Sequence, residues 1–144
     1  MSFSLDVNVL LYASDTSSPV HVAARRFLER AATGGDLLCL GWPTVMSYLR
    51  MATHPRIFVS PLSPSEALGN VEVLTGRPHV RLLAEEPGFL EVYREVTGAF
   101  PVRGNLVPDA HLATLLKQHG VRTLFSRDTD FRKFSFLSLR DPFA

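Results

Sequence analysis

The sequence contains a single cysteine, Cys39, and no apolar run as long as the roughly 20 residues that a membrane-spanning helix needs. One cysteine excludes a disulfide framework and any cysteine-rich zinc site. The first residues, MSFSLD, lack a basic stretch followed by an apolar one, so we expect no signal peptide. These absences predict a cytoplasmic protein without a membrane partner.

Lysine is scarce as well, because Lys117 and Lys133 are the only lysines among 15 lysine and arginine residues. Arginine binds phosphate groups bidentately, so this bias is compatible with a phosphodiester partner. An arginine-favouring genome would produce the same bias, and the net charge of +1 does not by itself indicate nucleic-acid binding. The apolar fraction of 46% and the charged fraction of 20% are typical of a globular protein, and the length suits a single domain over 1–144.

Segments with the apolar pattern of strands alternate along the chain with segments of helical periodicity. We expect strands over 3–12, 36–40, 79–86, 121–126 and 136–144. We expect helices over 18–32, 42–55, 63–76, 88–100 and 107–120, the first opened by Ser18 and Pro19. This alternation predicts an α/β fold with a mostly parallel sheet.

Asp6 is an unusual residue within the first predicted strand. Phe3, Leu5 and Val7 alternate along one face, and the apolar run continues to Tyr12, as in a strand that is covered on both faces. An ionised carboxylate is costly there unless another group pairs with it. Either Asp6 ends the strand and caps the next turn, or it has a function.

Three other aspartates are expected at the same edge of the sheet as Asp6. Asp109 lies in the first turn of the last predicted helix, and Asp128 and Asp130 follow the strand after it. Each alone has an ordinary explanation, as a helix-start or turn aspartate. In a parallel sheet, however, the carboxyl ends of the strands and the starts of the following helices share one edge, where sites form.

Gathered carboxylates repel one another by several kcal/mol at short range unless a cation offsets the repulsion. Oxygen ligands without histidine or cysteine suit Mg²⁺ or Mn²⁺, and the 5 histidines are too scattered for a zinc site. Such an ion can activate water and stabilise charge on a phosphate, as in many nucleases. Asn8 lies two residues after Asp6, on the same predicted strand face, and is placed to orient Asp6 or a water molecule.

Four segments together resemble the PIN-domain ribonuclease toxins of the VapC family: LDVNVLLYA, ATHPRIF, NLVPDAHLATLLKQHG and SRDTDFRKF. The similarity extends over essentially the whole chain, in order and at ordinary spacing. It implies a PIN-like three-layer α/β/α fold with a central parallel five-stranded sheet, and RNA cleavage that depends on Mg²⁺ or Mn²⁺. It also implies inhibition by a cognate antitoxin and frequent homodimerisation.

The acidic ligands of the family correspond to Asp6, Asp109 and Asp128, which are expected to bind metal and to act in catalysis, with Asp130 as an auxiliary metal ligand. Members of the family usually carry a further glutamate in a segment resembling WPxxxEFLR. Here the segment is WPTVMSYLR, with Ser47 at the position of that glutamate. Because serine brings no charge to a metal, this departure predicts weaker metal binding and reduced activity.

The expected substrate and partner follow from the same resemblance and from nearby basic residues. Arg127, Arg132 and Lys133 are expected to bind the RNA backbone. A tRNA or another structured RNA loop is the expected substrate, because an unstacked backbone can enter a narrow acidic site. We expect an antitoxin helix to dock in an apolar groove lined by residues such as Phe27 or Tyr48.

Two alternatives remain open. A degenerate PIN-like domain would bind RNA or an antitoxin with little or no catalysis, and Ser47 supports it. A phosphotransfer domain would use Asp6 as the acceptor. Receiver domains, however, need an acidic pair after the first strand, and haloacid-dehalogenase-like enzymes need an aspartate where this chain has Asn8.

Overall fold

The computed structural model describes residues 1–144, which form a five-stranded sheet, six α-helices and one 3₁₀-helix. The strands are β1 (Ser2–Leu5), β2 (Leu37–Gly41), β3 (Val80–Leu83), β4 (Thr123–Phe125) and β5 (Ser138–Arg140). The α-helices are α1 (Val7–Ser14), α2 (His21–Thr33), α3 (Trp42–Ala52), α4 (Pro64–Thr75), α5 (Phe89–Val96) and α6 (Leu106–Gln118). The 3₁₀-helix η1 (Thr129–Lys133) precedes β5. None of the helices combines the length and the apolar character needed to cross a membrane.

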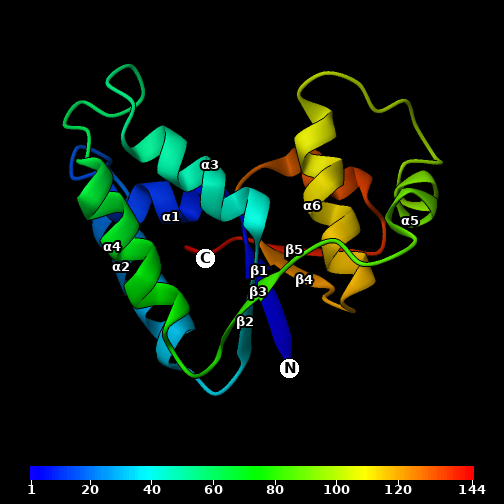
Figure 1. Cartoon of the computed structure of the whole chain (residues 1–144), viewed down its shortest axis with the longest axis horizontal. Coiled ribbons are helices and arrows are strands. Elements are labelled where there is room, and N and C mark those ends of the chain that lie inside the picture. The colour runs from blue at the N-terminus through cyan, green and yellow to red at the C-terminus, as the bar shows by residue number, and fades with distance from the viewer.

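All five strands are parallel and lie in the order β3-β2-β1-β4-β5. The central strand β1 pairs on one side with β2, where Phe3 lies opposite Leu38, and on the other with β4, where Leu5 lies opposite Phe125. Helices α1 to α4 lie on one side of the sheet, and α5 and α6 lie on the other (Figure 1). This arrangement confirms the predicted three-layer α/β/α fold with a parallel five-stranded sheet.

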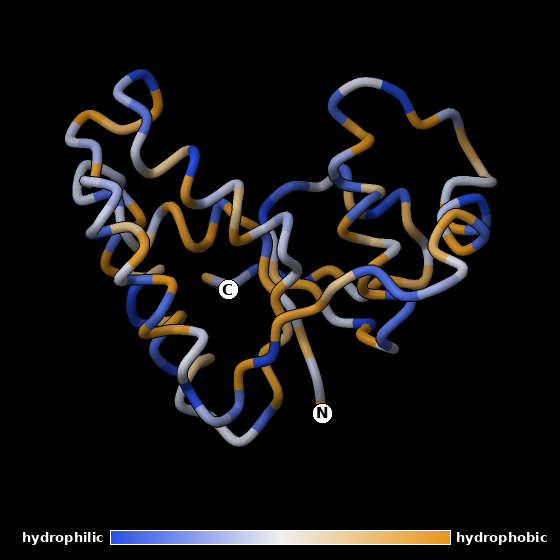
Figure 2. Tube along the Cα trace, viewed as in Figure 1, coloured by the Kyte–Doolittle hydropathy of each residue, from blue (hydrophilic) through white to orange (hydrophobic).

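Two apolar clusters fill the space between the sheet and its helical layers. Leu38 and Leu40 of β2 belong to the cluster that packs on α1 and α3, whereas Cys39 between them belongs to the cluster that packs on α6. This alternation follows from the two-residue period of a strand. The strands form the apolar centre of the trace, and the helices alternate between apolar and polar residues around it (Figure 2).

The predicted first strand over 3–12 is wrong in its second half, because the chain turns into α1 directly after Asp6. Residues 9–11 are consecutive, apolar and buried in this helix. A short continuous apolar run fits a buried strand and a buried helix equally well, so its periodicity could not separate the two. Asn8 therefore lies in the first turn of α1 and not on a strand face. Asp6 occupies the N-cap position, although its side chain makes no capping hydrogen bond.

All five predicted helices are present, as α2 to α6, and they differ from the predicted ranges only at their ends. α2 begins at His21 and not at Ser18, because Ser18 belongs to a turn in which its carbonyl accepts a hydrogen bond of 3.1 Å from the His21 N–H. Ser63 caps α4: its hydroxyl accepts from the Glu66 N–H at 3.1 Å, and Glu66 Oε1 accepts from the Ser63 N–H at 3.0 Å. This reciprocal capping box satisfies two donors that a helix start leaves free.

Candidate active site

The carboxyl ends of β1 and β4 lie side by side and place the acidic residues. Asp6 directly follows β1, and its backbone N–H donates to the Phe125 carbonyl at the end of β4, at 3.1 Å. Asp128 follows in the loop after β4, Asp130 lies in the first turn of η1, and Asp109 lies in the first turn of α6. The structure therefore brings these four aspartates to one edge of the sheet.

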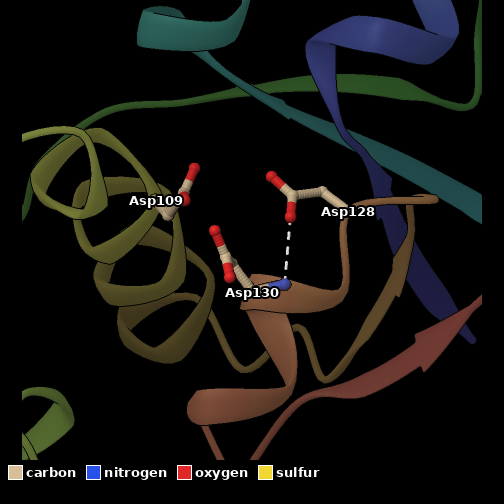
Figure 3. A group of neighbouring side chains, drawn as sticks. All are labelled: Asp109, Asp128 and Asp130. Carbon is tan, nitrogen blue, oxygen red and sulfur yellow. Dashed lines mark hydrogen bonds between the residues drawn. The ribbon is translucent and has the colours of Figure 1, made fainter.

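Asp109, Asp128 and Asp130 form a compact carboxylate group, in which one oxygen of each lies within 4.8 Å of the other two. Asp109 on α6 lies across from Asp128, in the loop before η1, and Asp130, at the start of η1 (Figure 3). The Asp130 backbone N–H donates to Asp128 Oδ1 at 2.9 Å, which fixes the turn into η1. Asp130, expected only as an auxiliary residue, is thus a full member of this group.

Asp6 is buried, with 7% of its surface exposed, and one hydroxyl links it to the carboxylate group. Ser126 Oγ donates to Asp6 Oδ2 at 2.9 Å and accepts from the Asp128 backbone N–H at 2.9 Å. Ser126 was not among the residues expected at the site. Its signal in the sequence is a serine two residues before an aspartate at a strand end, which is typical of a turn stabilised by a hydroxyl.

Burial, together with the proximity of the other carboxylates, raises the pKa values of Asp109 and Asp6. Burial raises the pKa of Asp109 to about 6, and the charges of Asp128, Asp6 and Asp130 contribute to the same shift. Burial also raises the pKa of Asp6, the Ser126 hydrogen bond opposes this, and the Asp128 charge adds to it. No lysine or arginine forms an ion pair with any of the four.

This donor set fits a divalent hard cation. It consists of carboxylate oxygens without histidine or cysteine, which are the ligands that Mg²⁺ and Mn²⁺ prefer. The mutual repulsion of the carboxylates has no counter-charge within the chain, so a bound cation would relieve it. The site can therefore hold a metal ion and present it at the open edge of the sheet.

The other residues expected at the site lie around this edge at different depths. The exposed Asn8 approaches Asp6, with its Nδ2 at 3.5 Å from Asp6 Oδ2. Ser47 is half-buried in the second turn of α3, the helix that begins at the carboxyl end of β2. The three basic residues expected to bind RNA are all exposed, and none of them forms an ion pair: Arg127, Arg132 and Lys133.

A mostly apolar cavity of about 350 Å³ lies among α1, α2, α3 and α4, and Tyr48 lines it as expected. The Tyr48 hydroxyl is held by Ser14 Oγ at 2.7 Å and by Asn70 Nδ2 at 3.0 Å. Phe27 does not line this cavity: its ring packs on Phe125 with a centroid distance of 5.0 Å and borders a different cavity. Both aromatic residues lie on the same helical side of the sheet, but only Tyr48 lines the mostly apolar cavity among α1 to α4.

Comparisons with known proteins agree with this arrangement. The family model described as PIN domain matches residues 4–137. Ribonuclease VapC48 of Mycobacterium tuberculosis is 47% identical over 144 residues, covering 100% of this chain and 99% of its own. Among solved structures, VapBC2 from Rickettsia felis, bound to a DNA fragment from its promoter, superposes with a TM-score of 0.70 at 13% identity, covering 98% of both chains.

A further solved structure is VapC20 of Mycobacterium tuberculosis, described as a Sarcin-Ricin loop cleaving toxin. It superposes with a TM-score of 0.68 at 14% identity, covering 96% of this chain and 98% of its own. At such low identities the two structures bear on the fold alone, whereas the family model and VapC48 match the sequence itself. The chain therefore belongs to the PIN domain family and, within it, to the VapC family.

Proposed function

We propose that residues 1–144 act as a single PIN domain, a metal-dependent endoribonuclease that is the toxin component of a toxin–antitoxin pair and cleaves RNA phosphodiester bonds. The carrying observation is the group of Asp109, Asp128 and Asp130, joined to Asp6 through Ser126. The name of VapC48, a ribonuclease with 47% identity, supports RNA as the substrate. The description of VapC20 as a toxin that cleaves an RNA loop supports a structured loop, such as one of a tRNA.

Asp109, Asp128 and Asp130 would hold the Mg²⁺ or Mn²⁺ ion, with Asp6 beside them as a further acidic ligand. When bound, the ion acts as a Lewis acid toward the phosphate and lowers the pKa of water. Ser126 keeps the carboxylate of Asp6 and the turn at Asp128 in fixed positions.

The exposed basic residues after β4 complete the proposed RNA site. Arg127, Arg132 and Lys133 carry charges that no carboxylate of the chain neutralises, so they are available to bind phosphates. They hold the backbone of an unstacked RNA loop across the acidic edge of the sheet.

The test is cleavage of an RNA hairpin with a single-stranded loop, with and without Mn²⁺, by wild type and Asp109→Asn. We expect cleavage to require the ion and to fall by about 100-fold or more in the variant, a loss typical of removing an electrostatic group that acts in the transition state. Asp36→Asn is the matched control, because Asp36 precedes β2 at the opposite edge of the sheet. RNA binding without cleavage would favour the degenerate domain, and equally fast cleavage of single-stranded DNA would contradict RNA specificity.

The cavity among α1 to α4 supports docking of an antitoxin helix. Its lining is mostly apolar and carries two arginines, Arg25 and Arg77, against one carboxylate, Glu29, and none of the three has an ion-pair partner in the chain. A partner helix with an apolar face and acidic flanks would satisfy both features. The VapBC2 structure, a complex of a toxin with its antitoxin, agrees with such a partner.

Co-purification of a small partner protein expressed from the native operon tests the docking site. We expect Val73→Arg to abolish co-purification, because Val73 lines the cavity and is 64% exposed, while RNA cleavage persists. Val59→Arg is the matched control, since Val59 is 82% exposed outside the cavity. Retention of the partner by Val73→Arg would place the docking surface elsewhere.

A further inference from the structure

Phe143, in the segment after β5, packs against Tyr12 and against Arg127, a sequence neighbour of two residues of the acidic site. Its ring centroid lies 6.3 Å from that of Tyr12 in the last turn of α1, and the guanidinium carbon of Arg127 lies 5.5 Å from the centre of the ring. Arg127 stands between Ser126, which binds Asp6, and Asp128. The segment after β5 thus returns toward α1, where the end marked C lies (Figure 1).

The segment that carries Phe143 is fixed at its start. The Arg140 carbonyl accepts from the Ser126 backbone N–H at 3.0 Å, so the segment leaves β5 directly beside the loop of the acidic site. Pro142 is buried, and the Phe143 N–H donates to Asp141 Oδ1 at 2.9 Å, which closes a turn. The ring is therefore held against Tyr12 and Arg127 by the backbone as well as by its own packing.

The Arg127 side chain is exposed, and its guanidinium carbon lies over the Phe143 ring. No carboxylate forms an ion pair with it. An exposed guanidinium beside a ring still has N–H groups that face solvent and can bind a phosphate. Arg132 and Lys133 are equally exposed on η1, but neither has an aromatic ring beneath it.

We propose that Phe143 is a positioning residue that holds Arg127 ready to bind a phosphate of single-stranded RNA beside the acidic site. The inference rests on the proposed ribonuclease function and adds a role for the segment after β5. An arginine that is already held in place loses less conformational freedom when the phosphate binds. The ring thereby favours RNA binding without touching the reacting atoms.

The experiment measures KM, kcat and the salt dependence of RNA binding for Phe143→Ala, Phe143→Tyr, Arg127→Ala and the double variant Phe143→Ala/Arg127→Ala. We expect Phe143→Ala to raise KM about 2- to 5-fold, as for loss of an exposed cation–π contact, with kcat unchanged. Phe143→Tyr keeps an aromatic ring at this position and should therefore have the same KM as wild type. Arg127→Ala should raise KM at least as much and lower the slope of log K against log salt by about 0.7, the value for one phosphate on a single strand. In the double variant, Phe143→Ala should add nothing further.

Two matched controls separate positioning from general effects. Phe136→Ala removes a cation–π contact with Lys117 of 5.0 Å at the far end of α6, and Arg122→Ala removes the same charge at the amino end of β4. Both should keep the KM of wild type, and thermal melting of every variant reports folding. If wild type cleaves RNA but Phe143→Ala keeps its KM and salt slope, or loses kcat instead, the inference is overturned and the proposed function stands. If wild type neither binds nor cleaves RNA, the proposed function is wrong and this inference falls with it.

Discussion

Ser126 and Asp6 are 120 residues apart in sequence, and a hydrogen bond of 2.9 Å joins the hydroxyl of one to the carboxylate of the other. The same hydroxyl accepts from the Asp128 backbone N–H. One small side chain therefore orients two acidic residues from two different strand ends. Because Asp6 is buried, the loss of this donor leaves a carboxylate with too few partners.

Ser126→Ala is expected to lower the free energy of unfolding by about 1–3 kcal/mol, because it leaves a buried carboxylate and the Asp128 N–H without a partner. Urea unfolding at pH 7 in the presence of a chelator measures the change. Ser4→Ala is the matched control, since Ser4 Oγ is buried and has no hydrogen-bond partner. An equal loss of stability in both variants would show that the Ser126 hydroxyl has no special role.

A divalent cation is expected to stabilise the folded chain, because only the folded state gathers the carboxylates. At a Mn²⁺ concentration of about 100 Kd the gain is about 2.7 kcal/mol, which raises the melting temperature. Asp109→Asn should lose this gain, yet should melt above wild type in the presence of a chelator, because it removes part of the mutual repulsion. A similar response of wild type and Asp109→Asn to Mn²⁺ would place the ion elsewhere.

The stability of the metal-free chain should fall as the pH rises from about 4 to about 6. The pKa of Asp109 is raised from 3.8 to about 6 in the folded chain, so the folded state binds more protons than the unfolded state in this window. The stabilising contribution is complete below pH 3.8 and is lost as the pH passes through about 6.

Urea unfolding across this pH range, with a chelator, measures the effect for wild type and Asp109→Asn. The difference between the two isolates Asp109 from the other titrating groups, including Asp6, whose pKa is also raised. Mn²⁺ affinity should rise over the same range, because the ion binds the ionised carboxylate. Parallel pH profiles for wild type and Asp109→Asn would contradict the raised pKa of Asp109.

Ser47→Glu is expected to tighten Mn²⁺ binding and to raise the rate of RNA cleavage, because it returns a negative charge at the position where the family usually has one. Wild type should then show low activity that requires high Mn²⁺. A metal titration of the cleavage rate compares wild type, Ser47→Glu and Ser47→Gln, which has the same size without the charge. If wild type is fully active and Ser47→Glu changes neither affinity nor rate, position 47 is not part of the site.

Local patterns of the sequence determined most of the elements. The Ser63 and Glu66 capping box, the stripe of buried residues behind Asp109 and the apolar strand residues of β2 all depend on contacts between residues close in sequence or on a simple period. The alternation of strands and helices then implied a parallel sheet, and the edge rule for such sheets implied where acidic residues gather.

Only the tertiary structure decided the conformation of the run after Asp6 and the contacts within the site. Both depend on which distant segments of the chain meet. The run after Asp6 became a helix because a continuous apolar run can be buried in either conformation, and packing of α1 on the sheet selected the helix. The full membership of Asp130, the bridge by Ser126 and the packing of Phe143 on Arg127 join residues from different elements. Side-chain periodicity within one segment carries no information about such pairs, so only the folded sheet edge reveals them.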